Sequence, residues 1–201
     1  MDPPWTLTGG AALVGFHTQH RTTRDLDLFW QGKRELSGCD RETEARLVAL
    51  GWQVRVIQRS PAFCRLLVKD EFEDVVLDLV ADPVPTVEEP LRLTLDEVTI
   101  LVDTRHEILV NKVCALLSRS EPRDLLDVRI LLLSGGNLER ALREAPMKDT
   151  GFSSLTLAWA LQNFPVRTIA LRSGVPENEI QLLERFNEHL IEQLTAASAP
   201  E

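Results

Sequence analysis

The segment Thr8-Gly9-Gly10-Ala11-Ala12-Leu13 constrains the fold of this chain more than any other stretch. It follows a short apolar run that starts at Trp5, and it leads into small and apolar residues typical of a helix start. This order predicts a strand that ends at a tight glycine turn, followed by a helix N-terminus. Because unpaired backbone N–H groups gather at a helix N-terminus, such a turn can bind an anion. The alternative is a turn that only reverses the chain.

Two carboxylates stand two residues apart in the next apolar run, Asp25-Leu26-Asp27-Leu28-Phe29. Side chains alternate between the faces of a strand, so Asp25 and Asp27 are expected to point the same way. Two oxygen-rich groups on one face suit a hard divalent cation such as Mg²⁺. A solvated edge strand with alternating polarity explains the same pattern without a metal.

A third carboxylate, Asp78, lies inside the apolar run from Val75 to Val80. A carboxylate in so apolar a strand must form an ion pair, bind a metal or take up a proton, because burying it bare is costly. The alternative to a metal site is a salt bridge to Arg24 or Arg65.

A lysine falls on the apolar side of the next predicted helix, which begins near Thr104 and runs to about Arg119. Its apolar stripe includes Ile108 and Val113, and Lys112 lies within that stripe. A lysine that faces inward needs an anionic partner. A structural ion pair or a snorkelling side chain satisfies this need, and so does the triphosphate of a nucleotide.

Two further carboxylates open the following helix, in Arg123-Asp124-Leu125-Leu126-Asp127. Asp124 and Asp127 are three residues apart and share a helix face. Acidic residues in a first helical turn also complement the helix dipole, so the pair by itself does not decide between structure and chemistry.

Taken together, these motifs resemble those of the AbiEii/AbiGii toxin family, within the DNA polymerase beta-like nucleotidyltransferase superfamily. The resemblance covers most of residues 5 to 134. It is carried by the glycine pair, the Asp-x-Asp strand, Asn111-Lys112 with a later arginine, and the Arg-Asp-x-x-Asp segment that ends at Asp127.

The resemblance and the strand pattern imply an α+β fold, with a nucleotidyltransferase-type mixed β-sheet flanked by helices and a C-terminal helical bundle. We expect about five strands, including 52–58, 63–69 and 75–80, and we interpret 88–102 as edge structure or a connection. Residues 1–103 form the predicted catalytic lobe. Residues 104–201 form a predicted helical lobe that contributes Lys112 and Asp124 or Asp127.

The resemblance also implies a reaction, in which an acceptor hydroxyl attacks the α-phosphate of an NTP and pyrophosphate leaves. Mg²⁺ or Mn²⁺ is expected on Asp25, Asp27 and Asp78, and Asp78 is a further candidate for accepting the hydroxyl proton. Asp124 or Asp127 is expected to orient Lys112 or the acceptor. The expected nucleotide-binding residues are Thr8, Gly9, Gly10, Arg21, Arg24 and Lys112, although the two arginines also suit simple charge balance.

Members of the resembled family act as toxins beside an antitoxin, and some modify tRNA ends. An RNA acceptor such as tRNA and an antitoxin partner are therefore implied by the resemblance. The alternatives are a small-molecule or protein acceptor, or a binding protein that keeps the fold without turnover.

Composition and charge limit the partners and the compartment that we expect for the chain. The formal charge of −9 argues against a broad nucleic-acid surface, although it allows a local one. The three cysteines are odd in number and far apart, which predicts reduced thiols. The absence of a signal sequence and of a long apolar run predicts a cytoplasmic protein without a membrane segment.

Overall fold

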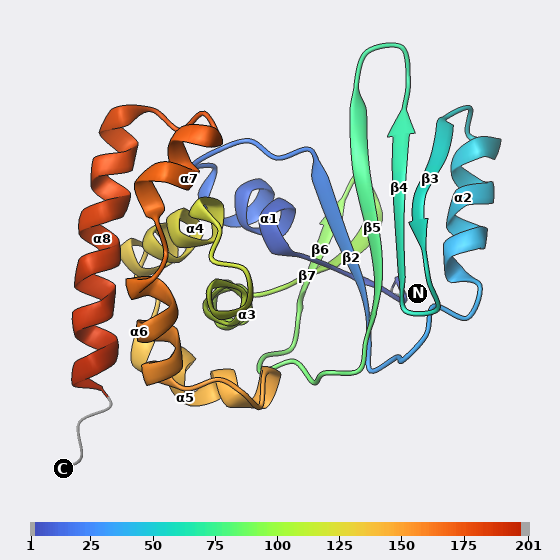
Figure 1. Cartoon of the computed structure of the whole chain (residues 1–201). Coiled ribbons are helices and arrows are strands. Elements are labelled where there is room, and N and C mark those ends of the chain that lie inside the picture. The colour runs from blue at the N-terminus through green and yellow to red at the C-terminus, as the bar shows by residue number, and fades with distance from the viewer. Residues whose placement is uncertain (1–2, 198–201) are drawn as a thin grey trace. The chain divides into compact units, whose positions relative to one another are not determined.

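The computed structural model describes residues 3–197 and divides the chain into two compact units (Figure 1). The first unit ends at Thr104 and contains every strand found in this part of the chain. The second unit begins at Arg105 and is helical. The expected α+β class, with a mixed sheet and a C-terminal set of helices, is confirmed.

The first unit is built on one seven-stranded mixed sheet with the order β3-β4-β5-β2-β1-β7-β6. The pairs β2–β5 and β1–β7 are parallel, and the other neighbouring pairs are antiparallel. The strands are β1 (Thr6–Thr8), β2 (Asp25–Gln31), β3 (Gln53–Arg59), β4 (Phe63–Lys69), β5 (Asp74–Asp82), β6 (Leu91–Leu95) and β7 (Val98–Val102).

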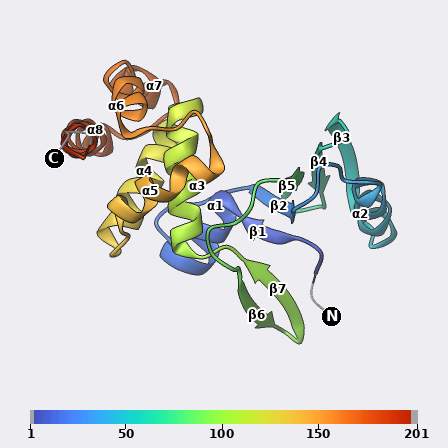
Figure 2. The same ribbon diagram turned by 90° about the horizontal axis from the view of Figure 1, so that it is seen from below.

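The expectation of about five strands was wrong, because residues 88–102 contain a β-hairpin. Figure 2 shows β6 and β7 as this hairpin beside β1. Its two turn residues, Asp96 and Glu97, both have positive φ angles, of 45° and 70°. Two-residue hairpin turns of this kind usually carry Asn-Gly or Asp-Gly, so the usual sequence signal was missing.

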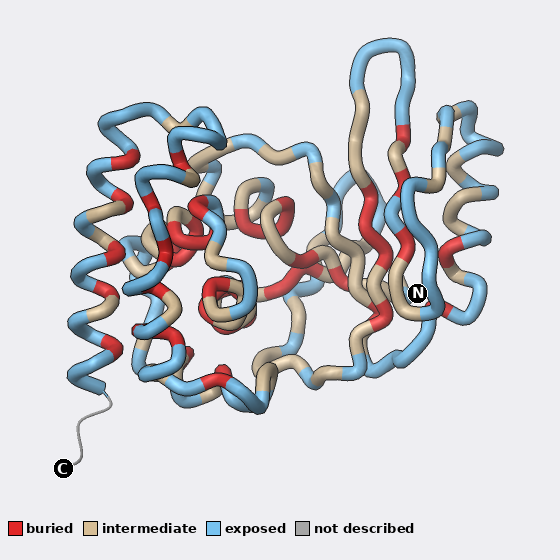
Figure 3. The backbone as a smooth tube through the Cα atoms, in the orientation of Figure 1, coloured by how far each residue is buried: buried red, intermediate tan, exposed pale blue. Residues whose placement is uncertain are grey.

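One face of the sheet carries the apolar core of the first unit. Buried side chains of β4 and β5, including Leu66 and Leu79, pack there with Trp30 of β2. Helix α2 (Cys39–Ala49) contributes Cys39 and Leu47 to this cluster and lies beside β3 in Figure 1. The buried stretches of β4 and β5 are red in Figure 3. The opposite face carries the polar side chains of Asp27, Arg65 and Asp78.

The second unit consists of six helices within the described residues. They are α3 (Arg105–Ser118), α4 (Pro122–Leu133), α5 (Leu138–Lys148), α6 (Ser154–Gln162), α7 (Val166–Arg172) and α8 (Glu177–Ala196). Helix α7 was not anticipated, because its seven residues are too few for a clear apolar period. Figure 3 shows α8 with one buried and one exposed side, as expected for an amphipathic helix on a core. In residues 3–197 no helix combines the length and hydrophobicity needed to cross a bilayer.

Candidate active site

A row of polar side chains crosses four neighbouring strands on the face opposite the core. Thr8 of β1 pairs in register with Asp27 of β2, Asp27 pairs with Asp78 of β5, and Asp78 pairs with Arg65 of β4. Residues paired in register on adjacent strands direct their side chains to the same face. Asp25 lies two residues before Asp27 and therefore joins this face. The strand order thus gathers the three predicted carboxylates from distant parts of the sequence.

The glycine turn approaches this row at its closest point. Gly9 follows β1 and opens the short helix α1 (Gly9–Ala12), with a φ angle of 62° that favours glycine. A Cβ atom built on Gly9 would lie 2.3 Å from Oδ2 of Asp27, which is closer than non-bonded atoms can approach. The missing side chain therefore lets the backbone of the turn lie directly against the Asp27 carboxylate.

The neighbouring Gly10 has a similar role toward Arg21. A Cβ atom on Gly10 would lie 2.8 Å from Nη2 of Arg21, so the guanidinium group packs against the turn. Thr8, the last residue of β1, is buried and donates a short hydrogen bond to Oδ2 of Asp103. Thr8, Gly9, Gly10 and Arg21, all predicted to bind the nucleotide, thus form one continuous part of the first unit.

Asp78 is held by Arg65 through two hydrogen bonds. Nε of Arg65 donates to Oδ1 at 2.8 Å, and Nη2 donates to Oδ2 at 2.6 Å. The Asp78 side chain is 9% exposed, and the Arg65 side chain is 45% exposed. Hydrogen bonding to Asp78 raises the pKa of the Arg65 guanidinium, and the charges of Asp25 and Asp27 add to this effect. Of the two arginines considered for Asp78, Arg65 is therefore the partner.

Arg24 has a different partner. Its Nη1 lies 3.3 Å from Oδ1 of Asp74, and its side chain is 82% exposed. This pairing corresponds to the charge-balancing alternative for Arg24, since the ion pair lies at the start of β5.

The arrangement of oxygens suits a hard cation at one end of the row. Asp25 and Asp27 present carboxylates on one face, and the backbone of Gly9 lies against Asp27. Both oxygens of Asp78 are already bound to Arg65. Across residues 3–197, no three His, Cys, Asp or Glu side chains are grouped so that they hold a metal ion. The three-carboxylate metal site therefore stays a prediction.

The helical unit contains a buried ion cluster around Lys112. The Lys112 side chain is 9% exposed, and its Nζ lies 2.7 Å from Oδ1 of Asp124 and 2.7 Å from Oδ2 of Asp127. The two carboxylates face one lysine because Asp124 and Asp127 are one turn apart on α4. This geometry is the structural ion pair considered for an inward lysine, and it ties α3 to α4.

Arg119 completes the cluster from the segment after α3. Its Nε donates to Oδ2 of Asp124 at 2.6 Å, and its Nη2 donates to Oδ1 at 3.0 Å. Burial alone would raise the pKa of Asp124, but the hydrogen bond from Arg119 and the charge of Lys112 outweigh it and lower that pKa. The buried carboxylate of Asp124 is thus held by both Lys112 and Arg119, as a buried charge requires. The role of Lys112 toward a triphosphate stays a prediction.

Residues 1–197 match the protein family described as "Nucleotidyl transferase AbiEii toxin, Type IV TA system". No curated protein matches the chain.

Two crystal structures from Helicobacter pylori are similar to the chain in fold. A putative nucleotidyltransferase has a TM-score of 0.52 and 20% identity, over 98% of this chain and 90% of that one. The protein JHP933 has the same TM-score and identity, over 97% of this chain and 87% of its own.

Proposed function

The chain belongs to the AbiEii nucleotidyltransferase toxin family, and we propose that its reaction centre is the polar sheet face around Asp25 and Asp27. The observation that carries this proposal is the close approach of Gly9 to Asp27. It places the start of α1 beside carboxylates, and a helix start and a carboxylate serve phosphate and cation respectively. A turn that only reverses the chain does not require a carboxylate against its backbone.

The reaction follows from the groups on this face. An acceptor hydroxyl attacks the α-phosphate of an NTP, so a new O–P bond forms, the bond between the α- and β-phosphates breaks, and pyrophosphate leaves. The Gly9–Gly10 turn binds phosphate oxygens, and Arg21 beside Gly10 supplies positive charge. The hydroxyl proton passes to a carboxylate of the face or to water. Catalysis is mainly positioning and charge neutralisation.

A divalent cation, Mg²⁺ or Mn²⁺, is the expected cofactor. When bound, it would neutralise the charge that develops on the phosphate oxygens. Asp25 and Asp27 are the proposed ligands. Asp78 joins them only if Arg65 releases it, so Arg65 sets how strongly the third carboxylate takes part.

The proposed acceptor is RNA, and its support lies on the same sheet face. Arg65 and Lys69 alternate along β4, and Arg55 of β3 pairs with Leu67 between them, so all three cations share the face of Asp78. Arg55 and Lys69 are exposed beside a hollow of about 360 Å³. A local group of cations next to a reaction centre suits RNA phosphates, even in a chain of charge −9. An antitoxin is the proposed partner, because the family is one of toxin–antitoxin systems.

The test is transfer of label from each of the four α-³²P-labelled NTPs in the presence of Mg²⁺. The acceptors are total RNA, a panel of aminoglycosides and a protein extract, and the expected product is labelled RNA. Label on an aminoglycoside or on a protein would show that the acceptor is not RNA. Label on none of the three kinds of acceptor would contradict the proposed reaction. The double variant Arg55→Gln/Lys69→Gln should lower transfer to RNA about tenfold at physiological salt.

A further inference from the structure

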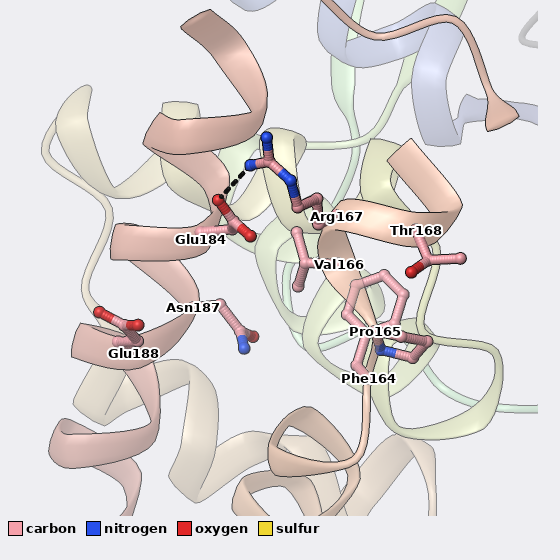
Figure 4. Close-up of a pocket in the computed structure, with 8 residues that line it drawn as sticks. All are labelled: Phe164, Pro165, Val166, Arg167, Thr168, Glu184, Asn187 and Glu188. Carbon is pink, nitrogen blue, oxygen red and sulfur yellow. Dashed lines mark hydrogen bonds and ion pairs between the residues drawn. The ribbon is translucent and has the colours of Figure 1, made fainter. Parts of the chain in front are cut away.

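The helical unit has a pocket of about 260 Å³ away from the Lys112 cluster. One side is the segment from Phe164 to Thr168, which leads into α7, and the other side is α8, through Glu184, Asn187 and Glu188 (Figure 4). Ligand pockets for drug-sized molecules begin at roughly 300 Å³, so this pocket suits a small group rather than a nucleotide.

The most informative residue of the pocket is Asn187. It is 8% exposed, and its Nδ2 donates to the carbonyl of Leu161 at 3.2 Å. This bond fixes the amide, so Oδ1 is the atom left to accept. Oδ1 is buried and accepts no hydrogen bond from any residue in the range 3–197. In Figure 4 the side chain points from α8 toward Phe164 and Pro165.

A buried acceptor of this kind requires a donor. A buried carbonyl oxygen without a hydrogen bond has lost its contact with water, and a ligand that donates a hydrogen bond would compensate for that loss. The ligand should therefore carry N–H groups.

The charges along α8 give the sign of that ligand. Glu184 accepts from Nη1 of Arg167 at 3.1 Å, and Nη2 of Arg167 donates to Glu177 at 2.5 Å. One cation is thus shared between two carboxylates. Glu188 forms none of the ion pairs found within residues 3–197. The α8 side of the pocket therefore carries excess negative charge, which repels anions and attracts cations.

The opposite side is apolar from Phe164 to Val166 and continues with Arg167 and Thr168. Phe164 and Val166 are 7% and 5% exposed, and Pro165 lies between them. An aliphatic chain can pack on these residues while its charged end reaches α8. An apolar side facing carboxylates and a buried amide oxygen matches a cation at the end of an alkyl chain. A bare metal ion would not use the apolar side.

We propose that this pocket binds an alkylguanidinium or alkylammonium group, with Asn187 Oδ1 and Glu188 as its acceptors. Such a group is carried by an arginine or lysine of a partner protein and by free diamines. The site uses no residue of the reaction centre, so it serves recognition or regulation rather than nucleotidyl transfer.

The test uses butylguanidinium and its neutral, similarly shaped counterpart butylurea as probes of the full chain. Binding is followed by calorimetry and by the NMR signals of the Asn187 side-chain amide. Butylguanidinium should shift these signals saturably, and butylurea should bind at least about tenfold more weakly, because it lacks the charge. Equal binding of both probes, or no shift at Asn187, would overturn the proposal.

The variant Glu188→Gln tests whether Glu188 binds the cation. It should leave the fold intact, because Glu188 is exposed. It should weaken butylguanidinium binding about fivefold, as expected for one exposed charge. The matched control Glu192→Gln, one turn further along α8 and outside the pocket, should bind as the unaltered chain does. Equal binding by Glu188→Gln and the control would refute the assignment.

The source of the cation is distinguished with two further ligands. A peptide with one central arginine represents a partner protein, and putrescine represents a free diamine. Tighter binding of the peptide supports the partner, and tighter binding of putrescine supports the diamine. Binding of neither overturns the proposal.

Discussion

Asp27 and Asp78 occupy directly paired positions on the parallel strands β2 and β5, and Arg65 holds Asp78 through both of its oxygens. Two carboxylates on neighbouring strands repel each other unless a cation lies between or beside them. Arg65 supplies part of that charge from β4. The polar sheet face therefore has Arg65 at one end and the glycine turn at the other.

Replacing Arg65 tests this balance of charge. Arg65→Met leaves the buried Asp78 beside Asp27 without its cation, so we expect a loss of about 1–2 kcal/mol in the free energy of unfolding, reduced because Arg65 is half exposed. Millimolar Mg²⁺ should raise the Tm of this variant more than that of the unaltered chain. Circular dichroism melts with and without Mg²⁺ measure both effects. The control Arg24→Met removes an exposed pair and should cost less than about 0.5 kcal/mol.

The glycine turn makes a second prediction. Gly9→Ala introduces a Cβ atom that overlaps the Asp27 carboxylate, at a φ angle that L-residues adopt with strain. We expect a loss of about 2 kcal/mol in stability and a large loss of transfer activity. Gly15→Ala is the matched control, because a Cβ atom there meets nothing within 4 Å. A Gly9→Ala enzyme as stable and active as the control would show that the turn has no need of glycine.

The buried cluster of the helical unit predicts a pH dependence. Because the pKa of Asp124 is lowered on folding, its charge stabilises the folded state above its unfolded pKa of about 4, and this contribution is lost as pH falls through the folded pKa. Asp124→Asn should cost about 3 kcal/mol at pH 7, and the difference from the unaltered chain should shrink below about pH 4. Urea unfolding at pH 7, 5 and 3.5 measures it. A difference that stays constant over this range would contradict the ion cluster.

The three cysteines should differ in reactivity. Burial raises the pKa of the Cys114 thiol to about 12 and also raises that of Cys64, which is fully buried. The thiolate is the reactive form, so at pH 8 iodoacetamide should label the half-buried Cys39 first. Mass spectrometry of timed digests gives the order. Faster labelling of Cys114 would indicate that its surroundings open readily.

Much of the sheet was predictable from local pattern. The strand predicted at 63–69 coincides with β4, and the Asp-x-Asp run lies on β2, because alternating apolar residues specify a strand with one buried face. The hairpin of β6 and β7 was not predictable in the same way. Its turn is Asp96-Glu97, which lacks the glycine that marks such turns, and its outer strand β6 is largely exposed.

The partners of the charged residues depend on contacts distant in sequence. The apolar surroundings of Asp78 require a partner, but only the pairing of β4 with β5 selects Arg65 over Arg24. Lys112 likewise required an anion, and the packing of α3 on α4 supplies Asp124 and Asp127. Local sequence therefore indicated the need for a charge partner, and tertiary structure decided its identity.

The most direct test of the proposed reaction centre is the rate of label transfer from α-³²P-labelled NTP by Asp27→Asn. The change keeps the size of the side chain beside Gly9 and removes its charge, so we expect transfer to fall at least about 100-fold with an unchanged circular dichroism spectrum. Asp96→Asn, in the hairpin turn at a φ angle that asparagine tolerates, is the control and should keep full activity. Transfer by Asp27→Asn at the rate of this control would contradict the account.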